Sequence, residues 1–151
     1  KRSAMEIVGW TTKDAAGHRL TSHGLDLARL PNPVIDHEEG HRGAFSNLER
    51  GLILTSICHR LPLEWKIMRT IIDGMRNGAV GNDRLDSRMM RRFGESTGYG
   101  WSNSTLQIRR VAAVTRMCEL GLVVRQRDGR KSVTRLVENV DDILQLSESD
   151  D

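Results

Sequence analysis

Aromatic side chains are scarce in this sequence, where two Phe, one Tyr and three Trp make up 4% of the chain. A hydrophobic core must therefore be built mainly from Leu, Ile, Val and Met. Cysteine is scarcer still, because Cys58 and Cys118 are the only two, and each lies in an apolar, helix-like run. This usage excludes a disulfide framework and favours two free, buried thiols.

Long apolar runs are missing as well. No uninterrupted apolar stretch approaches the roughly 20 residues that a membrane-spanning helix needs. The first residues lack the apolar segment of a secretion signal, which favours a soluble protein inside the cell. At 38% the apolar fraction is low for a packed globule of 151 residues, so we expect part of the chain to be irregular.

Motifs for catalysis are absent with one exception. The sequence contains no nucleophile elbow, no P-loop and no CxxC pair. The segment from His37 to His41 fits H-E-x-x-H, in which two histidines on a helix bind zinc. Nearby prolines and glycines oppose such a helix, so we favour a polar loop over a metalloprotease, and rank a structural zinc with His18 or His23 between them. We expect no enzymatic activity, no metal and no cofactor.

What the sequence does have is a concentrated positive charge. Between Arg84 and Arg135 lie twelve Lys or Arg and only four acids, a net charge of +8 in a chain whose total is +3. Residues 136–151 hold six acids and no base. Local ion pairs cannot neutralise the central excess, so a polyanion partner, most commonly nucleic acid, is favoured over a solvated surface.

The first third of the chain shows no sustained period. Glycines and two prolines interrupt short apolar pieces, with room for a short hairpin or helix between Thr11 and Leu25. We expect residues 1–44 to form an irregular N-terminal extension or arm, residues 45–146 a folded domain, and residues 147–151 an acidic tail. The tail is either a solubilising end or a segment that competes with nucleic acid for the basic surface.

A helical period begins at Ser46, where Ser46 and Glu49 match a capping box. Pro62 ends this helix and opens the next, which the pair Asn77-Gly78 ends. The first helix is expected to bury Leu48, Leu52, Ile53, Ser56 and Ile57, and the second Trp65, Met68, Ile71, Ile72 and Met75.

Two more helices and a β-hairpin are predicted after Gly78. The third helix covers residues 82–93 with Asn82 or Asp83 as its cap, and the fourth runs from a cap at 102–104 to about Leu120. Asp128-Gly129 joins two β-branched segments, at 122–127 and 132–137, as a hairpin turn. A short last helix is expected over residues 138–146. The fourth helix is expected to bury Ile108 or Val111, together with Val114, Met117 and Leu120.

This order of elements resembles the winged helix-turn-helix, and most closely the multiple antibiotic resistance regulator (MarR) type. The resemblance rests on Met117 to Val123, where that family ends its recognition helix with Gly-Leu-Val, and on Asp128-Gly129-Arg130 at the tip of the wing. It spans about residues 63–137. It implies a mainly α fold with a small β-hairpin wing, carrying here an irregular N-terminal extension. Three departures are a long turn from Gly94 to Trp101, an unmatched N-terminal extension and a last helix too short for that family's dimerisation helices.

The resemblance implies a DNA-binding surface on one side of the molecule. The fourth helix would enter the major groove with its first turns, and the wing would follow the backbone. The residues assigned to this surface are Ser104, Thr105, Gln107, Arg109, Arg110, Arg116, Arg125, Arg127, Arg130, Lys131, Arg135, Arg88, Arg91 and Arg92.

The expected function is sequence-preferring binding of double-stranded DNA by a cytoplasmic, nucleoid-associated protein. It would act as a transcriptional regulator or as the DNA-binding module of a replication or mobile-element protein, without a membrane partner. A homodimer stays open as a further possibility. The alternative is a winged-helix module that binds protein or RNA within a larger assembly, because fold alone does not decide function.

Overall fold

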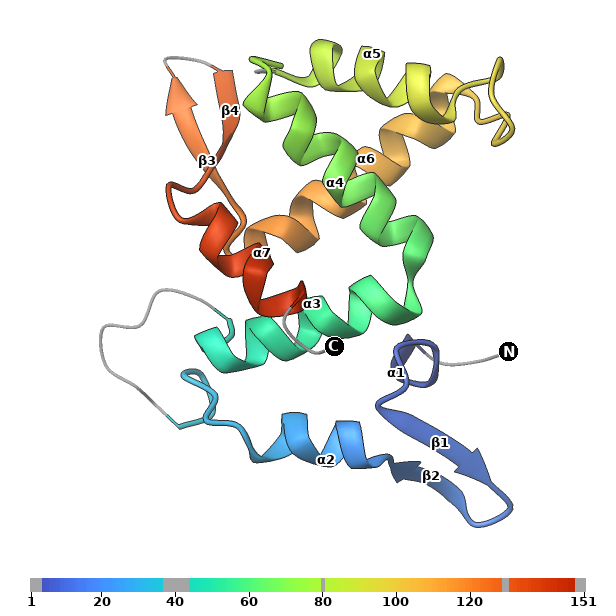
Figure 1. Cartoon of the computed structure of the whole chain (residues 1–151), viewed down its shortest axis with the longest axis vertical. Coiled ribbons are helices and arrows are strands. Elements are labelled where there is room, and N and C mark those ends of the chain that lie inside the picture. Colours follow the sequence, from blue (N-terminus) through green and yellow to red (C-terminus); the bar gives the residue numbers. More distant parts are fainter. Residues whose placement is uncertain (1–3, 37–43, 80, 129–130, 149–151) are drawn as a thin grey trace. The chain divides into compact units, whose positions relative to one another are not determined.

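The computed structural model describes residues 4–36, 44–79, 81–128 and 131–148 (Figure 1). Over these ranges the chain is mainly helical, with seven helices and two antiparallel β-hairpins. No helix in this part of the chain has the length and apolar character to cross a membrane. The chain divides into two compact units. The first unit comprises residues 1–62 and 141–151, and the second comprises residues 63–140.

The first unit contains the two shortest helices and one hairpin. Its elements are α1 (Ala4–Ile7), β1 (Thr11–Asp14), β2 (Gly17–Leu20), α2 (Ser22–Arg29), α3 (Asn47–Arg60) and nearly all of α7 (Val140–Glu148). The hairpin pairs Thr11 with Leu20 and Asp14 with Gly17. Helix α3 groups with the elements before it, and the boundary between the two compact units follows Pro62.

The N-terminal residues expected as an irregular arm are held against α3 by side-chain hydrogen bonds. Trp10 donates its indole N–H to the Ser56 hydroxyl at 3.1 Å, and the His23 Nε2 lies 2.8 Å from the same oxygen. Asn32 donates to the Glu49 carboxylate at 2.8 Å. Ser56 is only 2% exposed, so the bonds from Trp10 and His23 tie two separate segments to one buried position of α3.

The capping box predicted at the start of α3 is confirmed. The Ser46 hydroxyl accepts from the Glu49 amide, and the Glu49 carboxylate accepts from the Ser46 amide at 2.7 Å. This bond turns Glu49 inward, where it is 5% exposed, and the buried positions then continue through Ile53 and Ile57. Leu48, predicted to be buried, is instead 65% exposed because it lies one residue off that line.

A glycine in α2 allows that helix to lie against the backbone of Trp10. A Cβ at Gly24 would overlap the Trp10 carbonyl oxygen and crowd the Leu20 side chain. Within a helix, Gly→Ala ordinarily stabilises by about 1 kcal/mol. Here we expect Gly24→Ala to lower the free energy of unfolding by about 1–3 kcal/mol, because the backbone must shift to make room.

Urea unfolding of Gly24→Ala, followed by circular dichroism, measures this effect. Gly98→Ala is the matched control, because a Cβ there meets no atom within 4 Å. We expect the control to change stability by less than about 0.5 kcal/mol. A Gly24→Ala variant as stable as the parent protein would show that α2 does not lie this close to Trp10.

The second unit has the predicted order of three helices and a hairpin. Its elements are α4 (Pro62–Arg76), α5 (Asn82–Phe93), α6 (Asn103–Glu119), β3 (Val123–Asp128) and β4 (Lys131–Leu136) (Figure 1). Pro62 opens α4 as expected, and α4 ends before Gly78, whose φ of 76° is one that glycine adopts without strain. Ser102 caps α6 by accepting from the Thr105 amide.

Three details of the second unit differ from the prediction. The cap of α5 is Gly81, without a side-chain bond, because the Asn82 side chain bonds to another helix instead. Ile108 and Val111 are 69% and 52% exposed, so neither belongs to the buried line of α6. The β3–β4 ladder continues to a pair between Asp128 and Lys131, one residue beyond the predicted end of each strand.

The core of the second unit is aliphatic and Met-rich, as the scarcity of aromatics requires. Its most buried side chains are Ile67, Met68, Ile71, Ile72, Leu85, Met89, Phe93, Leu106, Ala113, Val114, Met117, Leu120, Leu122 and Val123. Phe93 is the one aromatic side chain among them. Trp65 and Met75, predicted as core positions of α4, are half-buried.

Candidate nucleic-acid interface

The first two turns of α6 present a polar and basic surface to solvent. Ser104, Gln107 and Arg109 are exposed, and Ile108 lies between them. Thr105 is half-buried, and its hydroxyl lies 3.0 Å from the Ser102 hydroxyl that caps the helix. Four of the assigned residues therefore lie together at the start of α6, three of them free to contact a ligand.

An aromatic cluster of Phe93, Tyr99 and Trp101 supports this end of α6. Phe93 stacks on Trp101 with ring centroids 5.1 Å apart, and Tyr99 packs edge-on against both rings. The Arg109 guanidinium lies 5.6 Å from the centroid of the Trp101 ring. Stacking on an indole restricts the orientations of Arg109 without using its hydrogen-bond donors.

The long turn between α5 and α6 is fixed by the same cluster. The Trp101 amide donates to the Phe93 carbonyl at 3.0 Å, and Gly94 forms an isolated β-bridge with Trp101. Lys66, from α4, donates to the Tyr99 hydroxyl at 2.8 Å. Trp101 thus anchors this loop, and the loop sets the direction in which α6 begins.

Arg110 points away from the exposed surface of α6. It is 8% exposed and pairs with the Asp86 carboxylate at 2.5 Å, while its Nη1 donates to the Asn82 side chain at 2.8 Å. Both partners belong to α5. The guanidinium is therefore used to hold α5 against α6, and Arg110 does not join the exposed residues that could contact nucleic acid.

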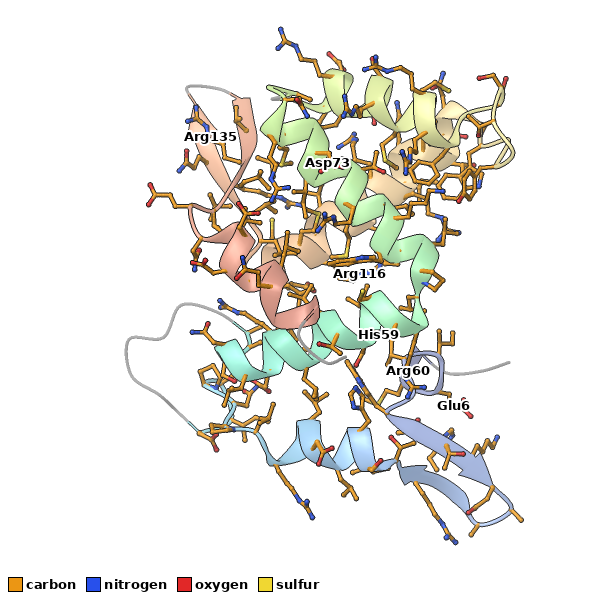
Figure 2. All side chains as sticks on the ribbon, viewed as in Figure 1. Glu6, His59, Arg60, Asp73, Arg116 and Arg135 are labelled. Carbon is orange, nitrogen blue, oxygen red and sulfur yellow. The ribbon has the colours of Figure 1, made fainter. Side chains whose placement is uncertain are left out.

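The other described arginines of α6 and the hairpin differ in availability. Arg116 forms an ion pair with Glu64 at 2.9 Å, and Arg125 donates to the Thr115 hydroxyl at 3.1 Å. Arg135 is exposed on β4, well away from Arg116 (Figure 2). Arg125 and Arg135 keep their charges at the surface, whereas the charge of Arg116 is neutralised locally.

The two hairpin arginines lie on opposite faces of the β3–β4 ribbon. Arg125 stands opposite Thr134, and Arg135 stands opposite Val124, the neighbour of Arg125. Successive residues of a strand point to opposite faces, so a flat surface can meet only one of the two arginines directly. A hairpin that contacts both would have its edge, not one face, against the ligand.

Neither cysteine forms a disulfide, as expected, and both are half-buried instead of fully buried. Burial raises the pKa of the Cys118 thiol, and the neighbouring Arg125 opposes this shift without cancelling it. The thiol is therefore protonated at neutral pH. A protonated thiol is a weaker nucleophile than a thiolate.

Several predicted positions lie outside the described residues. They include the His37–His41 motif, Arg130 and the end of the acidic tail, together with the side chains of Arg127 and Lys131. Among the residues that the structure describes, no group of three His, Cys, Asp or Glu side chains comes together to hold a metal.

The arginines of α5 lie on the flank of that helix that faces α4. Arg88, Arg91 and Arg92 line a pocket of about 300 Å³ together with Thr70 and Asp73 of α4. The opposite flank of α5 carries the two side chains that bond to Arg110 of α6. Arg88, Arg91 and Arg92 therefore lie on a different flank of α5 from Arg110.

The sequence contains a signal for the inward position of Arg110. Arg110 falls on the line Leu106, Ala113 and Met117, whose spacing matches one face of a helix, and all three are buried. The pocket residues Thr70 and Asp73 had no such pattern. They become neighbours of Arg88 only through the packing of α4 on α5.

No protein-family model matches this chain, and no curated protein and no solved structure is significantly similar to it. Conclusions about its function therefore rest on the geometry and charge of its own residues.

Proposed function

We propose that the second unit is a winged helix-turn-helix module that binds double-stranded DNA. Helix α6 would enter the major groove with its first turns, and the β3–β4 hairpin would act as the wing along the sugar-phosphate backbone. The observation that carries this proposal is the exposed start of α6, where Ser104, Gln107 and Arg109 project from a firmly anchored helix end.

The charge distribution supports a polyanionic partner. Residues 63–140 hold fifteen Lys and Arg against eight Asp and Glu, a net charge of +7, whereas the rest of the chain totals −4. Among the described residues, three of the fifteen, Arg76, Arg110 and Arg116, are paired with acids inside the unit. A surplus remains to attract phosphates over a distance set by ionic strength.

Three exposed residues at the start of α6 and two of the hairpin have distinct roles in this proposal. Arg109 suits the two acceptors of guanine, and Gln107 suits the donor and acceptor of adenine. Ser104 can bond a phosphate or a base edge. Arg125 and Arg135 contribute phosphate contacts from the hairpin, which add affinity and register but no sequence preference. Such a module serves a transcriptional regulator or a replication or mobile-element protein equally well.

One observation favours a second candidate function. Ile108 and Val111 expose apolar side chains on the same surface of α6 that would face DNA. Apolar groups in the major groove can contact the thymine methyl group, but they also suit a protein partner. The second candidate is therefore a winged-helix module that docks a protein through α6.

The test of DNA binding is the affinity for duplexes selected from a random pool, measured from 50 to 200 mM salt. We expect log K to fall linearly with log salt, by about 0.9 per phosphate contact. Arg109→Ala should weaken binding to the selected duplex by about 1–3 kcal/mol and relax the base preference at one base pair. Arg29→Ala, an exposed arginine of the first unit, serves as the control and should leave affinity unchanged.

The two candidates separate in the same assay. If α6 docks a protein, the parent protein will show no duplex binding at 50 mM salt, and Arg109→Ala will change nothing. Arg110 is unsuitable for this test, because its removal breaks the link between α5 and α6 and would lower binding through misfolding.

A further inference from the structure

We propose that the pocket between α4 and α5 is a separate binding site for phosphate groups. Three arginines line this pocket: Arg88, Arg91 and Arg92. Its volume of about 300 Å³ lies at the lower end of the roughly 300–1,000 Å³ typical of small-ligand pockets. The site is distinct from the start of α6, which lies on the other flank of α5.

The arginines of this pocket are available for a ligand. Over the described ranges, Arg88, Arg91 and Arg92 have no hydrogen bond or ion pair with another residue. Arg88 is half-buried, so its guanidinium is held close to the pocket instead of extending freely into water. Guanidinium groups have a planar fork of donors that fits the oxygens of phosphate in pairs.

The balance of charge in the pocket selects an anion. Asp73 is the one carboxylate that lines it, and its Oδ1 lies 3.8 Å from Arg76 of the next helical turn (Figure 2). Thr70 already donates its hydroxyl to the Lys66 carbonyl, so it presents an oxygen and no donor. Three guanidinium groups against one carboxylate exclude a metal cation and favour a multiply charged anion.

A second hollow extends the pocket along α5. It has a volume of about 240 Å³ and shares Arg88 and Arg91 with the first, while Arg84, Ser87 and Asn77 add further polar groups. Because both hollows are lined by the same two arginines, they adjoin each other. The ligand that fits this arrangement carries two or more phosphates in a row, as a free polyphosphate or as successive phosphodiesters of a nucleic-acid strand.

Gly74 of α4 lines the second hollow, at a close approach between α4 and α5. Gly74 of α4 is buried, and a Cβ there would lie 3.2 Å from the Leu85 side chain and 3.7 Å from the Cγ of Arg88. The absent side chain lets α5 approach α4 and brings the stem of Arg88 over the α4 backbone. The stem of Arg88 is therefore positioned by the packing of the unit and not by the ligand.

The experiment compares two double variants that remove the same charge from the second unit, R91Q/R92Q in the pocket and R109Q/R135Q outside it. Binding of tripolyphosphate is measured by calorimetry on the full chain, and binding of a random duplex by fluorescence anisotropy. All four substituted arginines are exposed, so both variants should fold, which circular dichroism checks. We expect R91Q/R92Q to lose at least about tenfold in tripolyphosphate affinity, because each charge-assisted bond contributes about that factor.

The two sources of phosphate give different results. If R91Q/R92Q loses tripolyphosphate binding and R109Q/R135Q keeps it, the pocket is a site for free polyphosphate. Absence of tripolyphosphate binding, with a larger loss of duplex affinity in R91Q/R92Q than in R109Q/R135Q, identifies a nucleic-acid strand. Equal losses in the two variants, or no loss for either ligand, would overturn the proposal. Failure of the parent protein to bind duplex contradicts DNA binding by α6 but leaves the tripolyphosphate result intact.

Discussion

Asp86→Ala should lower the free energy of unfolding by about 3 kcal/mol, the lower end of the range for breaking one half of a buried ion pair. The variant leaves the Arg110 guanidinium buried between α5 and α6 with the Asn82 amide oxygen as its remaining partner. The charge of Arg110 is then uncompensated at 8% exposure. Urea unfolding monitored by circular dichroism gives the difference directly.

Asp83→Ala is the matched control for this prediction, because Asp83 is an exposed acid in the first turn of the same helix. It should cost no more than the roughly 0.3–1 kcal/mol of a favourable charge at a helix N-terminus. The double variant Asp86→Leu with Arg110→Met should recover most of the lost stability, since apolar pairs of similar size often replace buried ion pairs without loss. A cost below about 1 kcal/mol for Asp86→Ala would mean that water reaches Arg110 freely.

This result bears on function as well as stability. The resemblance to the winged helix-turn-helix places Arg110 on the DNA-binding surface because it lies in the first turns of the fourth helix. Residues next to each other on a helix are 100° apart, so one can be exposed while the next is buried. Arg109 lies at the surface, whereas Arg110 is buried. Contact with bases can therefore be tested only with a variant of Arg109.

Local patterns in the sequence predicted the elements of the second unit well. The bounds of α5 match the prediction at both ends, because the buried Leu85, Met89 and Phe93 recur at helical spacing. The capping box of α3 and the stop at Gly78 were also predicted, since each depends on residues within four positions. Interactions over such short distances along the chain are encoded in the sequence itself.

Features that depend on contacts between distant segments were missed. The first 44 residues show weak periods, yet their described part forms helices and a hairpin, because Trp10 and His23 bond to Ser56 more than 30 positions away. The pocket of Arg88 likewise needs α4 as its second wall. The division of Arg125 and Arg135 between two faces follows from the register of the strands, which was not part of the prediction.

Phe93→Ala is expected to have the largest effect on the second unit, a loss of about 3–5 kcal/mol in the free energy of unfolding. Phe93 is fully buried and contacts both other rings of the aromatic cluster. Its removal leaves a cavity and frees Trp101, on which Arg109 stacks. Urea unfolding measures the stability, and Phe93→Leu, which fills most of the space, should cost clearly less.

The Phe93→Leu variant tests whether the aromatic cluster positions Arg109 for the proposed DNA contact. Tyr99→Phe keeps all three rings and removes only the bond from Lys66, so it should cost about 1 kcal/mol or less. At a temperature where Phe93→Leu remains folded, its affinity for the selected duplex should fall towards that of Arg109→Ala, because Arg109 loses its fixed platform. Full affinity in a folded Phe93→Leu variant would show that the cluster stabilises the fold without positioning Arg109.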